Sequence, residues 1–161
     1  MTKAQYLSWF DEVVGPTAPI FRLVPSDKLD WRLTETSFTI GQQLRHIPGS
    51  FGFFAKVINK EEWPARSLKE ILAANQNHPS SAVEEAVERF HASSGKFKHA
   101  VGRLSEEEFQ NGMLETPQSG RTYYWRYCAF ALEHHIHHLM ELHINLKCLG
   151  VHANTMTLYG W

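Results

Sequence analysis

Almost the whole chain repeats its apolar residues at the spacing of an α-helix, which leaves few folds open to it. No segment shows the alternating Val, Ile and Thr pattern that indicates a β-sheet. The periodicity predicts four main helices, at about residues 3–24, 37 or 39 to 59, 81–104 and 122–149. Long amphipathic helices bury their apolar faces against one another. We therefore expect an all-α fold, an antiparallel four-helix bundle with one long crossover, in a single domain spanning residues 1–161.

Local signals predict where these helices bend, begin and end. Pro16 and Pro19 predict a bend in the first helix, and Pro48-Gly49 predicts that the second helix is kinked or divided. The capping-box patterns Ser81-x-x-Glu84 and Ser105-x-x-Glu108 predict the start of the third helix and of a short helical turn after it. Gly150 stands in the C-cap position of the fourth helix.

The connecting segments are expected to be short or irregular. Leu29 and Trp31 are expected to tuck under the bundle between the first two helices. A further short helix is predicted near residues 67–75, and residues 112–120 are predicted to form a loop. The tail from Val151 to Trp161 is apolar enough to pack back on the bundle or against a neighbouring molecule.

The balance of charges excludes several kinds of partner. Sixteen Lys and Arg residues against 17 Asp and Glu residues give a net charge of -1, without a basic stripe for nucleic acid. No apolar stretch reaches the roughly 18 to 20 residues that cross a bilayer, and the N-terminus lacks the apolar core of a secretion signal. Cys128 and Cys148 lie too far apart on one predicted helix to bridge. We therefore expect a cytoplasmic protein that binds neither membranes nor nucleic acid.

The fourth predicted helix carries the run His134-His135-Ile136-His137-His138. The side of this helix that faces the core is marked by apolar residues at helical spacing, namely Cys128, Ala131, Leu132, Leu139, Leu142, Leu146 and Leu149. His135 points nearest the centre of this arc, His138 lies slightly to one side, and His134 lies at the edge. His137 falls on the polar side and is expected to be solvated. Two imidazoles one turn apart can bind one metal ion, so the pairs His134/His138 and His135/His138 both remain open.

A metal site in a bundle needs a further ligand from a facing helix. His46, on the flank of the apolar stripe of the second helix, is the best candidate. His91 and His99 on the third helix compete with it, whereas three further histidines are expected to be exposed or at helix ends: His78, His143 and His152.

Three segments of the chain resemble one known family. They are Leu29-Asp30-Trp31, the segment from Phe38 to Ile47, and Glu133-His134-His135-Ile136-His137-His138. They are similar to the connector, the second helix and the Glu-His-x-x-His-His segment of the DinB-like superfamily (DinB/YfiT-like metalloenzymes), which includes YfiT-like proteins and bacillithiol and mycothiol transferases. The resemblance covers nearly the whole chain. It implies a divalent metal held by His46, His134 and His138, and a homodimer.

Three neutral histidines would leave coordination positions open, as in catalytic sites. Nitrogen ligands suit Ni or Zn first, with Fe or Co as alternatives. Such an ion could activate water for hydrolysis or a thiolate for transfer, so the expected partner is a small-molecule substrate, including a low-molecular-weight thiol. The sequence specifies no catalytic residue, although Glu141 is a candidate base or outer acceptor. The alternative is a bundle that binds metal or a small ligand without catalysis.

Two further patterns bear on the site. A di-iron centre needs paired Glu-x-x-His motifs, and only Glu88-Arg89-Phe90-His91 occurs, so a dinuclear site is not expected. Aromatic residues could line a pocket beside the metal, although simple core packing is the more economical interpretation; they are Phe51, Phe53, Phe54, Tyr124 and Trp125.

Overall fold

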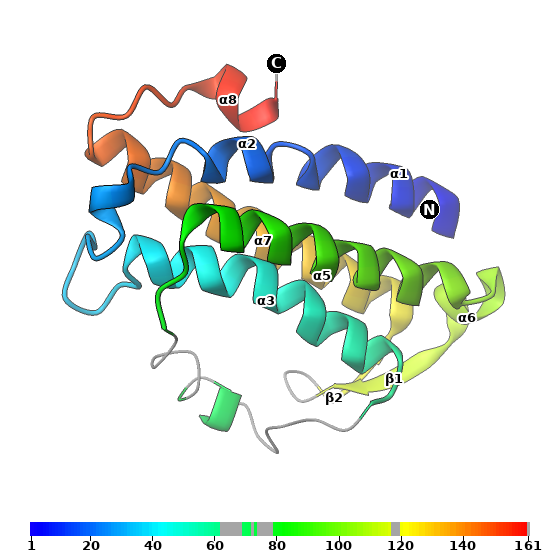
Figure 1. Ribbon diagram of the computed structural model, residues 1–161. Coiled ribbons are helices and arrows are strands. Elements are labelled where there is room, and N and C mark those ends of the chain that lie inside the picture. Colours follow the sequence, from blue (N-terminus) through cyan, green and yellow to red (C-terminus); the bar gives the residue numbers. More distant parts are fainter. Residues whose placement is uncertain (62–68, 72, 74–78, 117–119, 161) are drawn as a thin grey trace.

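The bundle is built from four long helices, α1 (Lys3–Val14), α3 (Ile40–Ile58), α5 (Val83–Arg103) and α7 (Tyr124–Cys148) (Figure 1). The computed structural model describes residues 1–61, 69–71, 73, 79–116 and 120–160. α1 and α7 run in one direction along the bundle, and α3 and α5 run in the other (Figure 1). α3 and α5 are neighbours that run parallel, so the chain has to return along the bundle between them. This return is the long crossover, and the predicted all-α class is confirmed.

The first predicted helix is divided rather than bent. α1 starts at a capping box, in which the Gln5 backbone N–H donates to the Thr2 hydroxyl over 3.2 Å. It ends at Gly15, and α2 (Thr17–Phe21) follows directly after Pro16. Pro16 cannot donate a backbone hydrogen bond, which favours the break. Pro19 lies in the first turn of α2, where a backbone N–H would have no acceptor within the helix, so its absence costs no helical hydrogen bond.

The start of α3 is fixed by the connector that precedes it. The connector includes a short 3-10 helix, Ser26–Lys28, after which Leu29 and Trp31 pack against the core as expected. The first two backbone N–H groups of α3, at Ile40 and Gly41, donate to the carbonyls of Trp31 and Leu29. The next is capped by the Thr39 hydroxyl, which accepts from the Gln42 N–H over 3.2 Å. The N–H groups that a helix start leaves unpaired are thus satisfied.

α3 continues through Pro48, so the predicted division of this helix is wrong. Leu44, Ile47 and Phe51, on either side of the proline, are almost fully buried. Their packing holds the helix together where one backbone hydrogen bond is lost.

α5 begins two residues later than its predicted capping box. Ala82 is the N-cap residue and no side chain caps the helix. The Ser81 backbone N–H instead donates to the Gly41 carbonyl over 2.9 Å, which ties this segment to the first turn of α3. A Cβ atom on Gly41 would lie 2.7 Å from the Ser80 side chain, so the approach requires glycine. The second capping box is confirmed, because Ser105 and Glu108 cap α6 (Glu106–Asn111) reciprocally.

The segment predicted as a loop at 112–120 contains half of a β-hairpin. β1 (Met113–Thr116) pairs antiparallel with β2 (Gly120–Tyr123), with Leu114 opposite Thr122. Leu114 and Thr116 are buried, and Met113 and Glu115 are exposed. Of the short helix predicted at 67–75, residues 69–71 and 73 are helical, and the rest lies outside the described residues.

The tail packs back on its own chain. Gly150 follows α7 with a φ of 76°, and the Val151 N–H donates to the Leu146 carbonyl, which closes the helix in a Schellman motif. α8 (Thr155–Tyr159) then lies against α2 (Figure 1). Ala153 is buried, and Leu158 packs against the core.

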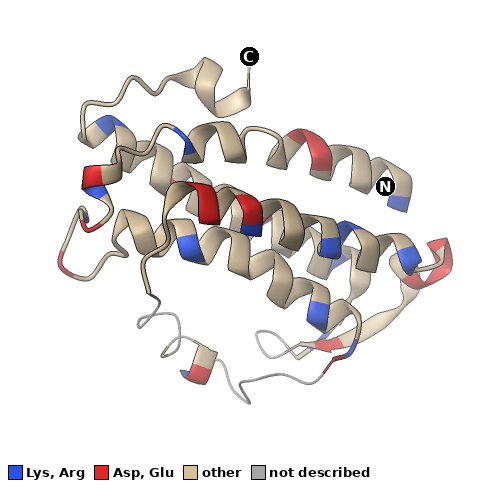
Figure 2. Ribbon diagram, in the orientation of Figure 1, with Lys and Arg blue, Asp and Glu red and all other residues tan. Residues whose placement is uncertain are grey.

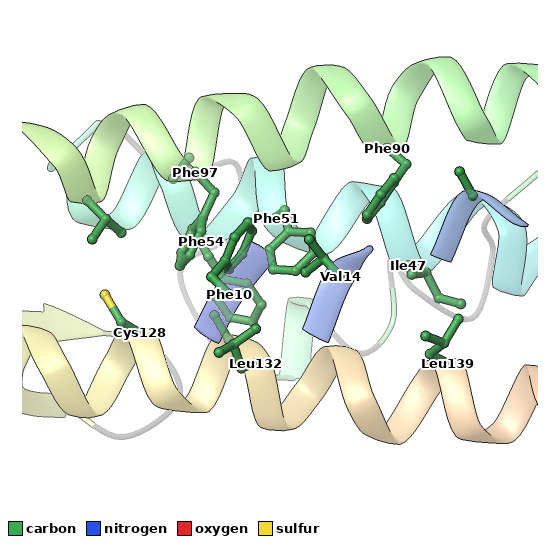
Figure 3. Close-up of a cluster of buried hydrophobic side chains, with 14 of the residues drawn as sticks. Phe10, Val14, Ile47, Phe51, Phe54, Phe90, Phe97, Cys128, Leu132 and Leu139 are labelled. Carbon is green, nitrogen blue, oxygen red and sulfur yellow. The ribbon is translucent and has the colours of Figure 1, made fainter. Parts of the chain in front are cut away.

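Aromatic side chains fill the centre of the bundle (Figure 3). Phe10 of α1, Phe51 of α3 and Phe97 of α5 contact one another with ring centroids 5.2 to 5.4 Å apart. On α7, Leu132 points toward Phe10, and Leu139 points toward Ile47 of α3 (Figure 3). These contacts fix the rotation of α3 and α7 about their own axes. That rotation determines which of their side chains lie at the edge of the core.

Charged residues of both signs are interspersed along the helices (Figure 2). Among the described residues, no helix combines the length and the apolar character that crossing a bilayer would require. Cys128 is buried and Cys148 is exposed, and neither forms a disulfide.

Candidate metal centre

Three histidines from two helices meet at the edge of the core. His46 comes from α3, and His134 and His138 come from successive turns of α7. One nitrogen from each ring lies within 4.8 Å of the other two. His46 is 7% exposed, and the other two are partly buried. The ring centroids of His46 and His134 both lie 4.5 Å from that of His138.

The closest approach is between two Nε2 atoms. Those of His46 and His138 are 3.2 Å apart, a distance at which one neutral ring can donate a hydrogen bond to the other. It is also the separation of two nitrogens on one metal ion, which is about 3.0 to 3.4 Å when each metal–nitrogen bond is about 2.1 Å. The two rings therefore need little movement to accept a shared ion.

Neighbouring core residues decide which histidines meet. On α7, His135 points into the bundle and is fully buried, with its Nε2 atom 3.0 Å from the Thr17 hydroxyl. Phe51 and Phe90 lie beside its ring, at centroid distances of 5.0 and 6.0 Å. With His135 held in the core, His134 and His138 lie on the flank that faces α3. Of the two pairs that the sequence left open, the structure brings His134 and His138 together.

The other described histidines lie outside this cluster. His91 and His99 are exposed on α5, and His137 is exposed on α7 as expected. His143 was expected to be exposed or at a helix end, but it is 5% exposed because its Nε2 atom lies 3.1 Å from the Asn154 carbonyl, under the tail. His152 is exposed, and His78 lies outside the described residues.

Burial keeps His134 uncharged. Desolvation is the main cause that lowers the pKa of His134 to about 3, and the nearby His138 and His137 lower it further. At neutral pH this imidazole is therefore neutral, as a metal ligand has to be. Its Nδ1 atom is buried and has no hydrogen-bond partner among the described residues. A buried nitrogen without a partner is costly, and a bound ion or an ordered water would relieve that cost.

A carboxylate stands behind His138. The Oε2 atom of Glu141 lies 3.4 Å from the His138 Nδ1 atom, on the side of the ring opposite Nε2. The hydrogen bond from His138 is the largest influence that lowers the pKa of Glu141, against a smaller opposing effect of burial. Carboxylates in this position commonly orient metal-binding histidines and raise their basicity.

Two buried amides lie next to this contact, and neither was predicted from the sequence to be functional. Gln43 lies close enough to help to lower the pKa of Glu141, and the Asn145 amide donates to the Gln43 Oε1 atom over 3.2 Å. Both amides are 1% exposed. Their spacing in the sequence could have indicated them. Gln43 is three residues before His46 and Asn145 is four residues after Glu141, so each shares a helix face with a residue of the site.

The cluster contains no carboxylate. Among the described residues, the three histidines form the one group of potential metal ligands that converges on a point. A dinuclear centre needs bridging carboxylates. The geometry therefore suits a single ion.

Comparison with known proteins places the chain in a family. The sequence model of the DinB superfamily matches residues 10–142. The chain belongs to the DinB superfamily. The matched residues include all three histidines of the cluster. The fold of this DinB superfamily member is also similar to that of a DinB-like protein, YjoA, from Bacillus subtilis.

The likeness to YjoA has a TM-score of 0.66 at 20% sequence identity and covers 91% of this chain and 92% of that chain. At this identity it bears on the fold alone. The comparison with curated proteins finds no match.

Proposed function

We propose that this DinB superfamily protein binds one divalent metal ion through His46, His134 and His138, and acts as a metal-dependent enzyme on a small molecule. The observation that carries the proposal is the convergence of three imidazoles at the edge of the core, with two Nε2 atoms 3.2 Å apart. Burying such a group of rings is costly unless something binds them. Ni or Zn suits three nitrogen ligands first, and Fe or Co would also fit.

The chain's own groups prepare the site in three ways. Burial holds His134 neutral, and Glu141 fixes the ring of His138 from behind. Aromatic rings supply an apolar wall, because Phe38 lies 5.2 Å from His46 and Phe54 lies 5.4 Å from His134 between ring centroids. When bound, a divalent ion with three protein ligands has positions left for a substrate and acts as a Lewis acid there. We propose a thiol-dependent transferase or a hydrolase as the reaction type, with a low-molecular-weight thiol as one candidate substrate.

Metal binding is tested by elemental analysis. We expect about one equivalent of metal per chain in the purified wild type, and a loss of most of it in the His134→Ala/His138→Ala variant. His137→Ala is the matched control, since His137 belongs to the same run but is exposed, and it should keep the wild-type metal content. Equal metal content in the double variant and the wild type would exclude the site.

Catalysis is tested separately with a panel of substrates. Low-molecular-weight thiols paired with electrophilic acceptors test the transferase, and esters and amides test the hydrolase. We expect turnover that chelation abolishes, that re-added Zn or Ni restores, and that the double variant lacks. If the protein holds metal but no turnover depends on it, the enzymatic part of the proposal fails and non-catalytic metal binding takes its place.

A further inference from the structure

A cavity of about 780 Å³ opens between α3 and α5, which lie side by side (Figure 1). We call it the α3–α5 cavity. Its walls include residues at helical spacing on both helices, namely Gly49, Gly52, Phe53 and Lys56 on α3 and Gly95 and Lys96 on α5. Small-molecule sites have volumes of about 300 to 1,000 Å³, so the cavity is large enough for one. None of the three histidines of the candidate metal centre lines it.

Neither the backbone nor the packing requires the three glycines of the α3–α5 cavity. All three lie inside helices without a positive φ angle, so any residue could adopt their conformation. A Cβ atom on Gly49 or Gly95 would meet no atom within 4 Å among the described residues, and one on Gly52 would lie 3.9 Å from the Ser93 side chain, an ordinary contact. Glycine inside a helix lowers the stability of that helix relative to alanine. What the three glycines share is the cavity, which larger side chains would fill.

The groups that carry full charge around the cavity are mostly positive. Lys56 and Lys96 are exposed, and neither forms an ion pair with a carboxylate of the described residues. The carboxylate at the cavity is that of Glu61, which accepts a hydrogen bond from the Asn59 amide over 3.1 Å. Two ammonium groups less one carboxylate leave a single positive charge, which favours a ligand with one negative charge.

Phe53 adds an aromatic surface to the cavity. Its side chain is half-buried and packs against the core, which holds the ring in place. An aromatic ring prefers to pack against another flat apolar group in a stacked or edge-to-face arrangement. The cavity therefore combines a place for an apolar body with a place for a negative charge.

We propose that the α3–α5 cavity binds a small organic anion, a monocarboxylate on a flat apolar body. Lys56 and Lys96 attract the carboxylate, and the apolar body lies along Phe53 in the space that the glycines leave open. This site lies apart from the three histidines and does not rest on the proposed metal function.

Isothermal titration calorimetry of the full chain with naphthalene-2-carboxylate tests the site. We expect saturable binding of one carboxylate per chain, with a dissociation constant in the micromolar to millimolar range. The neutral naphthalene-2-carboxamide has the same body without the charge, so it should bind at least about tenfold more weakly. A carboxylate that does not saturate the protein, or a carboxamide that binds equally well, would overturn the proposal.

Filling the cavity tests where the carboxylate binds. In Gly49→Leu/Gly95→Leu both new side chains project into open space, so the dissociation constant should rise at least about tenfold. The urea midpoint should stay the same or rise, because leucine is the better helix former. Gly102→Leu is the matched control, since its Cβ would also meet nothing within 4 Å but Gly102 does not line the cavity, and it should bind as the wild type does. A folded double variant that binds as tightly as the wild type would exclude the cavity.

Charge removal distinguishes this cavity from the candidate metal centre, since a bound metal ion also attracts carboxylates. Lys56→Gln/Lys96→Gln should weaken binding of naphthalene-2-carboxylate at least about tenfold. Lys98→Gln is the control, because Lys98 forms an ion pair with a carboxylate of α1 at 2.8 Å and does not line the cavity, so this variant should bind as the wild type does. His134→Ala/His138→Ala should also keep the wild-type affinity. If binding is lost with the histidines, or is unchanged without the two lysines, the proposal is wrong.

Discussion

Among single side chains, Glu141 is the one that most directly supports the candidate metal centre without belonging to it. Its Oε2 atom lies 3.4 Å from the His138 Nδ1 atom, Gln43 helps to lower its pKa, and Asn145 donates a hydrogen bond to Gln43. Removing such a partner commonly lowers metal affinity by about 10- to 100-fold, because the ring of the ligand loses its orientation and basicity. We expect Glu141→Ala to weaken Zn and Ni binding by that amount and Glu141→Gln, which keeps an acceptor, by less.

Competition with a chromophoric chelator measures these affinities. Glu88→Gln, a change of the same kind at an exposed carboxylate on α5, should bind metal as the wild type does. If Glu141→Ala binds as tightly as the wild type, the contact with His138 has no role in holding the metal.

The histidines also show how far sequence reasoning reaches for single residues. The spacing of His134 and His138 and the flank position of His46 sufficed to nominate all three. The helical wheel could not choose between His134 and His135, because both lie on or beside the apolar arc. That choice depends on Thr17, Phe51 and Phe90, which belong to three other helices and take up His135.

Helix starts are where local sequence and packing agree or compete. At α3 the Thr39 cap and the connector carbonyls together fix the first turn, and His46 lies less than two turns later. We expect Thr39→Ala to lower the free energy of unfolding by about 1 kcal/mol, because the Gln42 N–H loses its acceptor. Urea denaturation measures the change. Thr36→Ala, the same substitution in the exposed connector, should change stability by less than about 0.5 kcal/mol, and equal effects of the two variants would contradict a capping role.

The four helices could be predicted from their sequence because each carries a long apolar repeat. The errors fall where tertiary contacts override a local signal. Ser81 has the right partner three residues later for a cap, but its backbone is bonded to Gly41, so α5 starts after it. The β1–β2 hairpin has strands of four residues, too short for an alternating pattern to be recognised. Pro48 was expected to kink or divide α3, but the helix continues through it because the buried residues on both sides hold it together.

At the scale of the whole molecule, His135 is a point of contact between several helices of the bundle. This side chain of α7 contacts Thr17 of α2, Phe51 of α3 and Phe90 of α5, so four helices meet around one imidazole. Figure 3 shows Phe51 and Phe90 between α3, α5 and α7. Burial is the main cause that lowers the pKa of His135 from 6.5 to about 3, with smaller contributions from His134 and His138. The fold is therefore built around a neutral histidine.

This arrangement predicts how the stability of the metal-free protein depends on pH. Between pH 6.5 and about 3 the unfolded chain binds a proton at His135 that the folded chain does not bind. Stability contributed by the neutral imidazole is thus fully present above pH 6.5 and is lost as the pH falls toward 3, at about 1.4 kcal/mol per pH unit for this group. His134 has a pKa lowered in the same direction and adds to the slope.

Urea denaturation of the chelator-treated protein at a series of pH values measures that slope. We expect His135→Phe to reduce the slope by the contribution of about one bound proton, whatever the variant does to stability at neutral pH. Phe97→Leu is the control, because it loosens the core at a fully buried site without removing a titrating group, so it should lower the curve without changing its slope. If His135→Phe keeps the wild-type slope, the acid sensitivity of the fold has its origin in other groups.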